Sequence, residues 1–223
     1  MAQDGDARPP HEEDPRVARS RARLLDAATA CFLARGYDGT TVEQVAETAG
    51  VSRRTAFNVY ADKDSLFRAA LGRSVATAQR FTGSLTERVH LVPGRGDLRT
   101  ALEELALDLA TTVLTGPVVP LRRLLAREGE RFPDLLEDYR RGAPEAVLRA
   151  LAGCLADLHG RGELDVPDPA VAAEHFAFLV MGADLDRGML GRPPPPPARV
   201  RDRARSGAAA FCRAYVPRGG APA

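Results

Sequence analysis

The sequence predicts an all-α protein, in which an N-terminal three-helix helix-turn-helix head is followed by a larger helical body. Apolar residues recur every three or four positions along most of the chain, which is the spacing of amphipathic helices. Glycine and proline interrupt this pattern at intervals, and no alternating strand pattern runs for more than a few residues.

Composition and charge describe an ordinary globular chain. Its 223 residues are 44% hydrophobic and 27% charged, which is sufficient for a self-supporting core. The net charge of +1 excludes a uniformly basic nucleic-acid coat protein but not a local basic face. Cys31, Cys154 and Cys212 are far apart and match no disulfide framework or metal motif. We therefore expect buried, reduced cysteines, with no metal and no cofactor.

The first fifteen residues have the composition of a disordered tail. Acidic residues and proline dominate residues 1–15, and almost none of these residues is apolar. The N-terminus has no apolar signal-peptide segment, and no stretch approaches the roughly 18 apolar residues of a membrane span. We expect a cytoplasmic protein that does not contact a membrane.

The next segment, residues 16–63, is predicted to hold three helices. Thr41 is a good N-cap for the second helix, and Gln44 follows it at the spacing of a capping box. Ser52 caps the third helix. Because three helices this short cannot bury a stable core alone, a fourth helix that begins at Asp64 is expected to pack beneath them.

The third helix has a polar outer face that suits the reading of DNA bases. At 100° per residue, Ala56 and Tyr60 face the core, and Arg54 and Asn58 lie on the opposite side. In the major groove, arginine favours guanine and asparagine favours adenine. The basic run from Arg16 to Arg23 is a candidate for further contacts to the DNA backbone. The alternative is that these side chains only solvate surface helices.

The stretch from Ala22 to Leu71 resembles the DNA-binding segment of the TetR/AcrR family. The shared motifs are FLARGY at 32–37, GTTV at 39–42, VAETAGVS at 45–52, TAFN at 55–58, Lys63-Asp64 and Leu66-Phe67. They stand in register without a gap across about 50 residues. The resemblance implies a homodimeric regulator of transcription that binds double-stranded DNA.

The resemblance also implies which residues contact DNA. The family's phosphate contacts fall on Thr41, Ser52, Phe57 or Asn58, and Lys63, which is the only lysine of the chain. The family's base-reading positions fall on Arg53, Arg54, Thr55 and Asn58. The sequence departs from the family at Ala56, where a large aliphatic residue is usual, and at Phe57 and Val59, where tyrosine or histidine is usual. Losing those polar tips removes possible phosphate bonds.

The body, residues 64–223, resembles more weakly the family's ligand-sensing and dimerising domain. The expected helices span 64–80, 97–115, 117–131, 133–141, 144–159, 168–190 and 198–215, separated by glycine and proline breaks. Asp168 is expected to cap its helix, with Pro169 at the first position.

In the family, the last two long helices form the interface of a homodimer, here residues 168–190 and 198–215. Such a dimer matches the two half-sites of a palindromic or pseudo-palindromic operator. The apolar stripes that would form the interface are Ala172, Ala173, Phe176, Leu179, Val180, Met181 and Ala183, then Val200, Ala204, Ala208, Phe211, Cys212 and Tyr215. The alternative is that these stripes form the core of a single chain.

An apolar or amphipathic small-molecule effector is expected among the helices at 97–115, 117–131 and 144–159. Candidate residues lining its pocket are Leu105, Leu109, Val113, Leu121, Leu125, Phe132 and Phe176. Each of these residues also fits a role as simple core.

The predicted function is a transcriptional repressor released by its ligand, and three alternatives stay open. The first alternative is a ligand-dependent activator, the second is a helical binding module without DNA activity, and the third is an enzyme. Against an enzyme, ExxH occurs once, at Glu87–His90, whereas a di-iron bundle needs it twice. No nucleophile-elbow, phosphate-loop, dinucleotide or zinc-protease motif is present.

Overall fold

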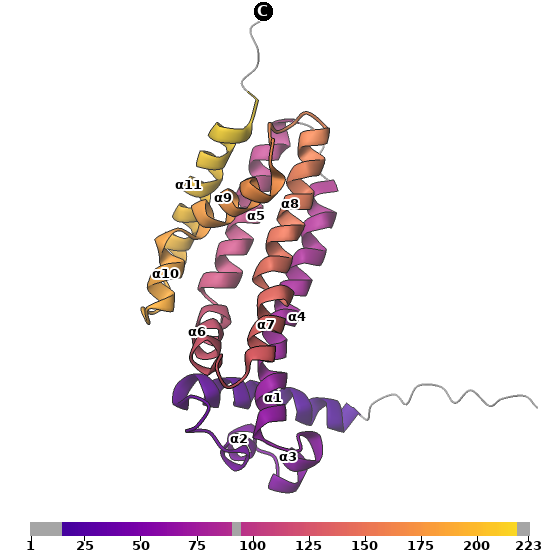
Figure 1. The fold of residues 1–223 in the computed structure, drawn as a ribbon, viewed down its shortest axis with the longest axis vertical. Helices are drawn as coiled ribbons and strands as arrows, with labels where there is room; N and C mark the ends of the chain where they lie inside the picture. The colour runs from indigo at the N-terminus through magenta and orange to yellow at the C-terminus, as the bar shows by residue number, and fades with distance from the viewer. Residues whose placement is uncertain (1–14, 91–94, 218–223) are drawn as a thin grey trace, which may run out of the picture. The chain divides into compact units, whose positions relative to one another are not determined.

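The computed structural model describes residues 15–90 and 95–217, and every regular element within them is an α-helix (Figure 1). The helices are α1 (Pro15–Arg35), α2 (Val42–Ala49), α3 (Arg53–Val59), α4 (Lys63–His90), α5 (Arg95–Leu114), α6 (Val118–Glu128), α7 (Pro133–Gly142), α8 (Pro144–Gly160), α9 (Pro169–Met181), α10 (Ala183–Met189) and α11 (Pro197–Tyr215). The all-α prediction is thus confirmed. The predicted disordered tail lies, except for Pro15, outside the described residues.

Contacts divide the chain into two units, Met1–Ala70 and Leu71–Ala223. The N-terminal unit holds α1, α2, α3 and the first two turns of α4. Its core is organised by three aromatic rings, because Phe67 packs edge-on against Phe32 at 4.9 Å and against Tyr37 at 5.0 Å between ring centroids. Phe67 therefore ties α4 to α1, as expected of a fourth helix that completes the head.

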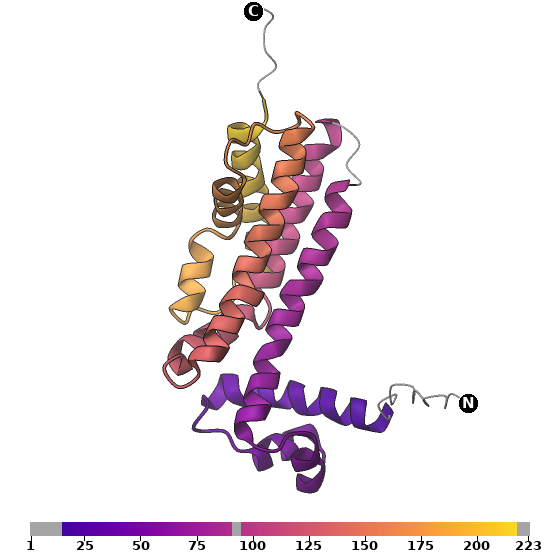
Figure 2. The ribbon, with the colours of Figure 1, turned by 45° about the vertical axis from the view of Figure 1, so that its right-hand side comes forward.

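The C-terminal unit is a helical bundle in which α9 and α11 pack against α5, and α8 packs against α9 (Figure 2). Phe176 of α9 and Phe211 of α11 meet edge-to-face, with ring centroids 5.2 Å apart, and both are fully buried. Asp168 caps α9 as expected, since its Oδ1 accepts hydrogen bonds from the backbone N–H of Ala170 and Val171.

Two predicted helices were wrong in extent. The helix expected at 64–80 continues as α4 to His90. The single helix expected at 168–190 is broken into α9 and α10 at Gly182, whose φ of 53° and ψ of −151° lie where only glycine is comfortable. A Cβ at this position would also overlap Nη1 of Arg203. Hydrophobic periodicity continues across this break, which is why the periodicity predicted a single helix.

A buried carboxylate joins α10 to α11 immediately after the break. Asp184 is 5% exposed and accepts hydrogen bonds from Arg187 at 2.9 Å and Arg199 at 2.8 Å, and Arg203 lies 3.3 Å from its other oxygen. Burial acts to raise the pKa of Asp184, but the hydrogen bonds from Arg199 and Arg187 hold it below its ordinary value. The helix break thus places one anion among three cations.

The three cysteines are free and buried, as predicted. Burial raises the pKa of Cys154 and of Cys212. Within residues 15–90 and 95–217, no single helix has the length and apolar character to cross a membrane; Leu98–Leu114 and Val118–Glu128 meet these criteria only as a pair bent by 49°. The same residues contain no group of three or more metal-ligating side chains placed to hold an ion.

The break at Gly182 predicts opposite effects for two glycine-to-alanine substitutions. Gly182→Ala should destabilise the protein by about 1–3 kcal/mol, because alanine must adopt a strained backbone conformation. Gly153→Ala, in the middle of α8 with nothing within 4 Å of its Cβ position, should stabilise it by about 0.5–1 kcal/mol. Urea unfolding followed by circular dichroism gives both values. Equal effects from the two substitutions would contradict the assigned strain.

Candidate nucleic-acid interface

The second helix of the head is fixed at both ends by its own sequence. The Thr41 hydroxyl accepts a hydrogen bond from the Gln44 backbone N–H at 3.2 Å, and the Gln44 side chain accepts one from the Thr41 N–H at 3.1 Å. This is the predicted capping box. Gly50 ends α2 in the left-handed conformation, with φ of 63°. The direction in which the chain leaves α2 is therefore set locally.

The third helix begins at once after this turn and buries one side. The Ser52 hydroxyl accepts from the Thr55 N–H at 3.1 Å and so caps α3, as predicted. Ala56 of α3 and Ala46 of α2 are both buried to 1% exposure, which lets the two helices approach closely. The small residue at 56, a departure from the family pattern, is thus accommodated by close packing.

The opposite side of α3 carries the side chains predicted to read bases. Arg53, Arg54 and Asn58 are exposed and make no hydrogen bond or ion pair with any described residue. Phe57 is 44% exposed beside them, and Thr55 is half-buried with its hydroxyl 2.8 Å from that of Ser52. A helix face of unpaired donors and one aromatic ring can hydrogen-bond base edges and contact a thymine methyl group.

Lys63 has a more specific environment than the sequence indicated. Its Nζ lies 4.2 Å from the centroid of the Tyr37 ring and 3.5 Å from the Asp38 carbonyl oxygen. The Tyr37 hydroxyl donates to the Asp64 carboxylate, which orients the ring. Lys63 forms no ion pair with a described carboxylate, so its charge stays available to a phosphate while the ring restricts its position.

One contact of the head was missed at the sequence level. Arg23 is the last residue of the basic run from Arg16 to Arg23. Its Nη2 donates a hydrogen bond to the Gly50 carbonyl oxygen at 3.4 Å. A side chain on Gly50 would meet this guanidinium at 2.6 Å. Arg23 therefore supports the turn between α2 and α3. The pairing was missed because it joins residues 27 positions apart.

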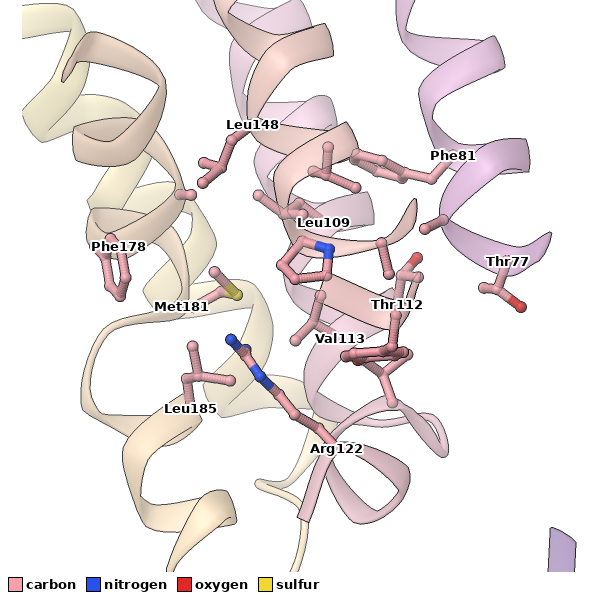
Figure 3. Close-up of a pocket in the computed structure, with 17 residues that line it drawn as sticks. Thr77, Phe81, Leu109, Thr112, Val113, Arg122, Leu148, Phe178, Met181 and Leu185 are labelled. Atoms are coloured by element: carbon pink, nitrogen blue, oxygen red, sulfur yellow. The ribbon is translucent and has the colours of Figure 1, made fainter. Parts of the chain in front are cut away.

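A second candidate site is a cavity of about 130 Å³ in the C-terminal unit, lined by residues of α4 to α10 (Figure 3). Of the predicted lining residues, Leu109 and Val113 line it. The remaining five, Leu105, Leu121, Leu125, Phe132 and Phe176, are buried in the packing of the unit and do not line this cavity. Helical spacing identifies an inward-facing residue, but not whether a cavity or a neighbour lies opposite.

The other fifteen of the seventeen residues that line the cavity were not predicted from the sequence. Arg122, Tyr139 and Phe178 line the cavity together with Met181 and Leu185. Arg122 follows the pattern of a surface position on an amphipathic helix, so no sequence signal pointed inward. Tyr139 lies in α7, a helix not considered as part of the pocket.

The apolar stripes of the last two long helices are mostly used within one chain. Of the residues predicted for the interface, Leu179 and Ala183 are exposed and Tyr215 is half-buried, whereas the remaining ten are buried. The cause is a close helix crossing, since a Cβ on Gly207 of α11 would lie 2.5 Å from the Leu179 carbonyl oxygen of α9. The large apolar side chains left exposed on α9 are Val171, Phe178 and Leu179.

An all-α chain with a capped helix-turn-helix in its head and a cavity in a separate helical unit has the organisation of a one-component regulator. Two models of known protein families match the chain. The family model described as "Bacterial regulatory proteins, tetR family" matches residues 24–70, and "AefR-like transcriptional repressor, C-terminal domain" matches residues 100–217. The chain belongs to the TetR family of transcriptional regulators.

Individual relatives agree with the family. The transcriptional repressor AcnR of Corynebacterium jeikeium is 41% identical over 58 residues, which are 26% of this chain and 31% of AcnR. A TetR-family regulator of Mesorhizobium loti, solved at 1.54 Å, is 27% identical with a TM-score of 0.78, covering 92% of this chain and 100% of that one. The flavonoid-responsive regulator FrrA is 28% identical with a TM-score of 0.63, covering 91% and 100%.

The position of Lys63 predicts a contribution to DNA binding that does not depend on base sequence. Lys63→Met should weaken binding equally for a preferred duplex and a scrambled one, and should reduce the salt slope of log K by about 0.9, the value for one phosphate contact. Fluorescence anisotropy across a range of KCl concentrations measures this. Arg127→Met, on the exposed part of α6, is the matched control. An unchanged slope in Lys63→Met would refute the phosphate contact.

Proposed function

We propose that this chain is a sequence-specific DNA-binding repressor of transcription that releases its operator when a small apolar or amphipathic ligand binds. The observation that carries the proposal is the exposed, unpaired face of α3, formed by Arg53, Arg54 and Asn58. Unpaired guanidinium and amide groups on a helix that follows a tight turn are suited to the major groove. Repression is supported by the family description that matches residues 100–217.

The DNA contacts proposed around this face are of two kinds. Arg53, Arg54, Thr55 and Asn58 read base edges, and Thr41, Ser52, Phe57 and Lys63 fix the head on the backbone. Support comes from the positions of Thr41 and Ser52 at helix N-termini, where backbone N–H groups favour phosphate. Phe57 has no polar tip, so its contribution is an apolar contact.

The proposed active form is a homodimer joined through α9 and α11. Phe178 is 59% exposed and Leu179 and Val171 are each more than 40% exposed on α9, so this helix presents an apolar surface unusual for a face in water. A two-fold dimer presents two copies of α3 to a palindromic or pseudo-palindromic operator. When one head of the dimer is bound, the second head is held at a high effective concentration near its half-site, which raises the affinity of the dimer.

The cavity of the C-terminal unit is the proposed effector site. Its lining is dominated by apolar side chains such as Leu109, Val113, Met181 and Leu185, which suits an apolar or amphipathic molecule. The similarity to a regulator described as flavonoid-responsive supports control by a small molecule. A ligand shifts DNA binding only by its difference in affinity between the bound and released conformations. The proposed site of action is the cytoplasm.

Sequence selection with two variants of one arginine tests the proposal. The wild-type chain should enrich a two-fold motif from random duplexes. Arg54→Ala should lose about 10- to 100-fold in affinity for that motif, together with the preference at one position in each half-site. Arg54→Lys keeps the charge but loses the paired donors of the guanidinium group. Its affinity for random DNA should therefore match that of wild type, whereas the base preference at that position should still be lost.

The control for folding and for bulk charge is Arg127→Ala on α6, which should leave the motif unchanged. If Arg54→Ala selects the same motif with the same affinity, then α3 is not the reading helix. If wild type enriches no motif at any salt concentration, the chain is a helical binding module rather than a reader of DNA sequence.

A further inference from the structure

The cavity of the C-terminal unit contains one cation in a largely apolar lining. Of its seventeen lining residues, Arg122 of α6 is the only one with an ionisable charge at neutral pH. Figure 3 shows its guanidinium extended into the space between Met181 and Leu185. A charged group placed against apolar side chains loses hydration, so it requires a partner.

Arg122 has no such partner among the described residues. Four described arginines are half-buried, namely Arg68, Arg122, Arg123 and Arg203. Arg123 donates to the Gly188 carbonyl at 3.3 Å, Arg203 lies 3.3 Å from Asp184, and Arg68 is also engaged. Only Arg122 among these four makes no hydrogen bond or ion pair with the described residues. The neighbouring Arg123 shows that this helix can pair a half-buried guanidinium.

A second polar group faces the same space. Tyr139 of α7 lines the cavity, is 5% exposed, and its hydroxyl forms no hydrogen bond with the described residues. Burial raises the pKa of Tyr139, and the nearby charge of Arg122 opposes that rise. The phenol therefore stays protonated at neutral pH and can donate. Arg122 and Tyr139 together offer donors to one acceptor group.

The dimensions of the cavity limit the ligand. An apolar cavity of about 150 Å³ holds one benzene molecule, so the 130 Å³ found here fits a single ring or a short branched chain. A guanidinium binds a carboxylate or a phosphate through two parallel hydrogen bonds, and the planar carboxylate is the smaller of the two groups and suits a cavity of this size.

We infer that the effector is a small organic acid, with a ring or short alkyl group in the cavity and a carboxylate bound by Arg122 and Tyr139. This inference rests on the proposed effector role of the cavity and adds the charge and size of the ligand. A neutral molecule of the same shape leaves Arg122 desolvated without a partner, so the site discriminates by charge.

The test compares two ligands that differ only in charge. We would titrate the full-length protein with 4-ethylbenzoate and with 4-ethylbenzamide at pH 7.5, with binding followed by ligand-observed NMR. Wild type should bind the acid at least about tenfold more tightly than the amide. Arg122→Met keeps a side chain of similar length but removes its charge. This variant should lose the preference for the acid and keep its affinity for the amide.

Three further variants separate charge from folding. Arg122→Lys should keep a preference for the acid, Tyr139→Phe should reduce it several-fold, and Arg127→Met, which removes an exposed charge from the same helix, should leave it unchanged. Equal affinities for acid and amide in wild type would overturn the inference while leaving the cavity as a ligand site. If neither compound binds wild type, the single-ring acid is excluded. DNA selection, measured without ligand, reports on the reading head separately.

Discussion

The packing of Phe67 against Phe32 and Tyr37 is the interaction on which the DNA-reading head depends. These rings, with centroids 4.9 Å and 5.0 Å from that of Phe67, join residues from α1, the turn after it and α4. Tyr37 also lies under the Lys63 ammonium group and donates to Asp64. The same ring therefore belongs both to the core and to the surface where a phosphate is proposed to bind, which couples head stability to DNA affinity.

The arginines of this chain differ in whether their charge is paired and in how far it is solvated. Three arginines surround the buried Asp184 and hold α10 against α11. Arg53 and Arg54 on α3 and Arg122 in the cavity are left without a partner among the described residues. On α3 water solvates the unpaired charge at little cost, whereas at Arg122 the apolar surroundings make it expensive. The first arrangement suits transient contact with DNA, and the second is the arrangement proposed to bind a ligand of opposite charge.

Local rules predicted the head well and the body less well. The caps at Thr41, Ser52 and Asp168 follow from side-chain chemistry within three residues, and the burial of Ala56 follows from helical periodicity. The break at Gly182 is instead a backbone conformation in a place where a side chain would meet Arg203 of another helix. The cavity depends on the space left between seven helices, so only Leu109 and Val113 were anticipated as its lining. The inward direction of Arg122 is likewise a property of tertiary packing.

Chemical interference on an enriched duplex would show whether two copies of α3 enter the major groove, as proposed. Guanines methylated at N7, in the major groove, should block binding at two clusters of positions related by two-fold symmetry. Their centres should lie about one helical turn, or a whole number of turns, apart. Arg54→Ala should lose interference at one guanine in each cluster. Interference only from bases methylated in the minor groove would contradict the entry of α3 into the major groove. Interference from ethylated phosphates without any sensitive guanine or adenine would contradict it as well.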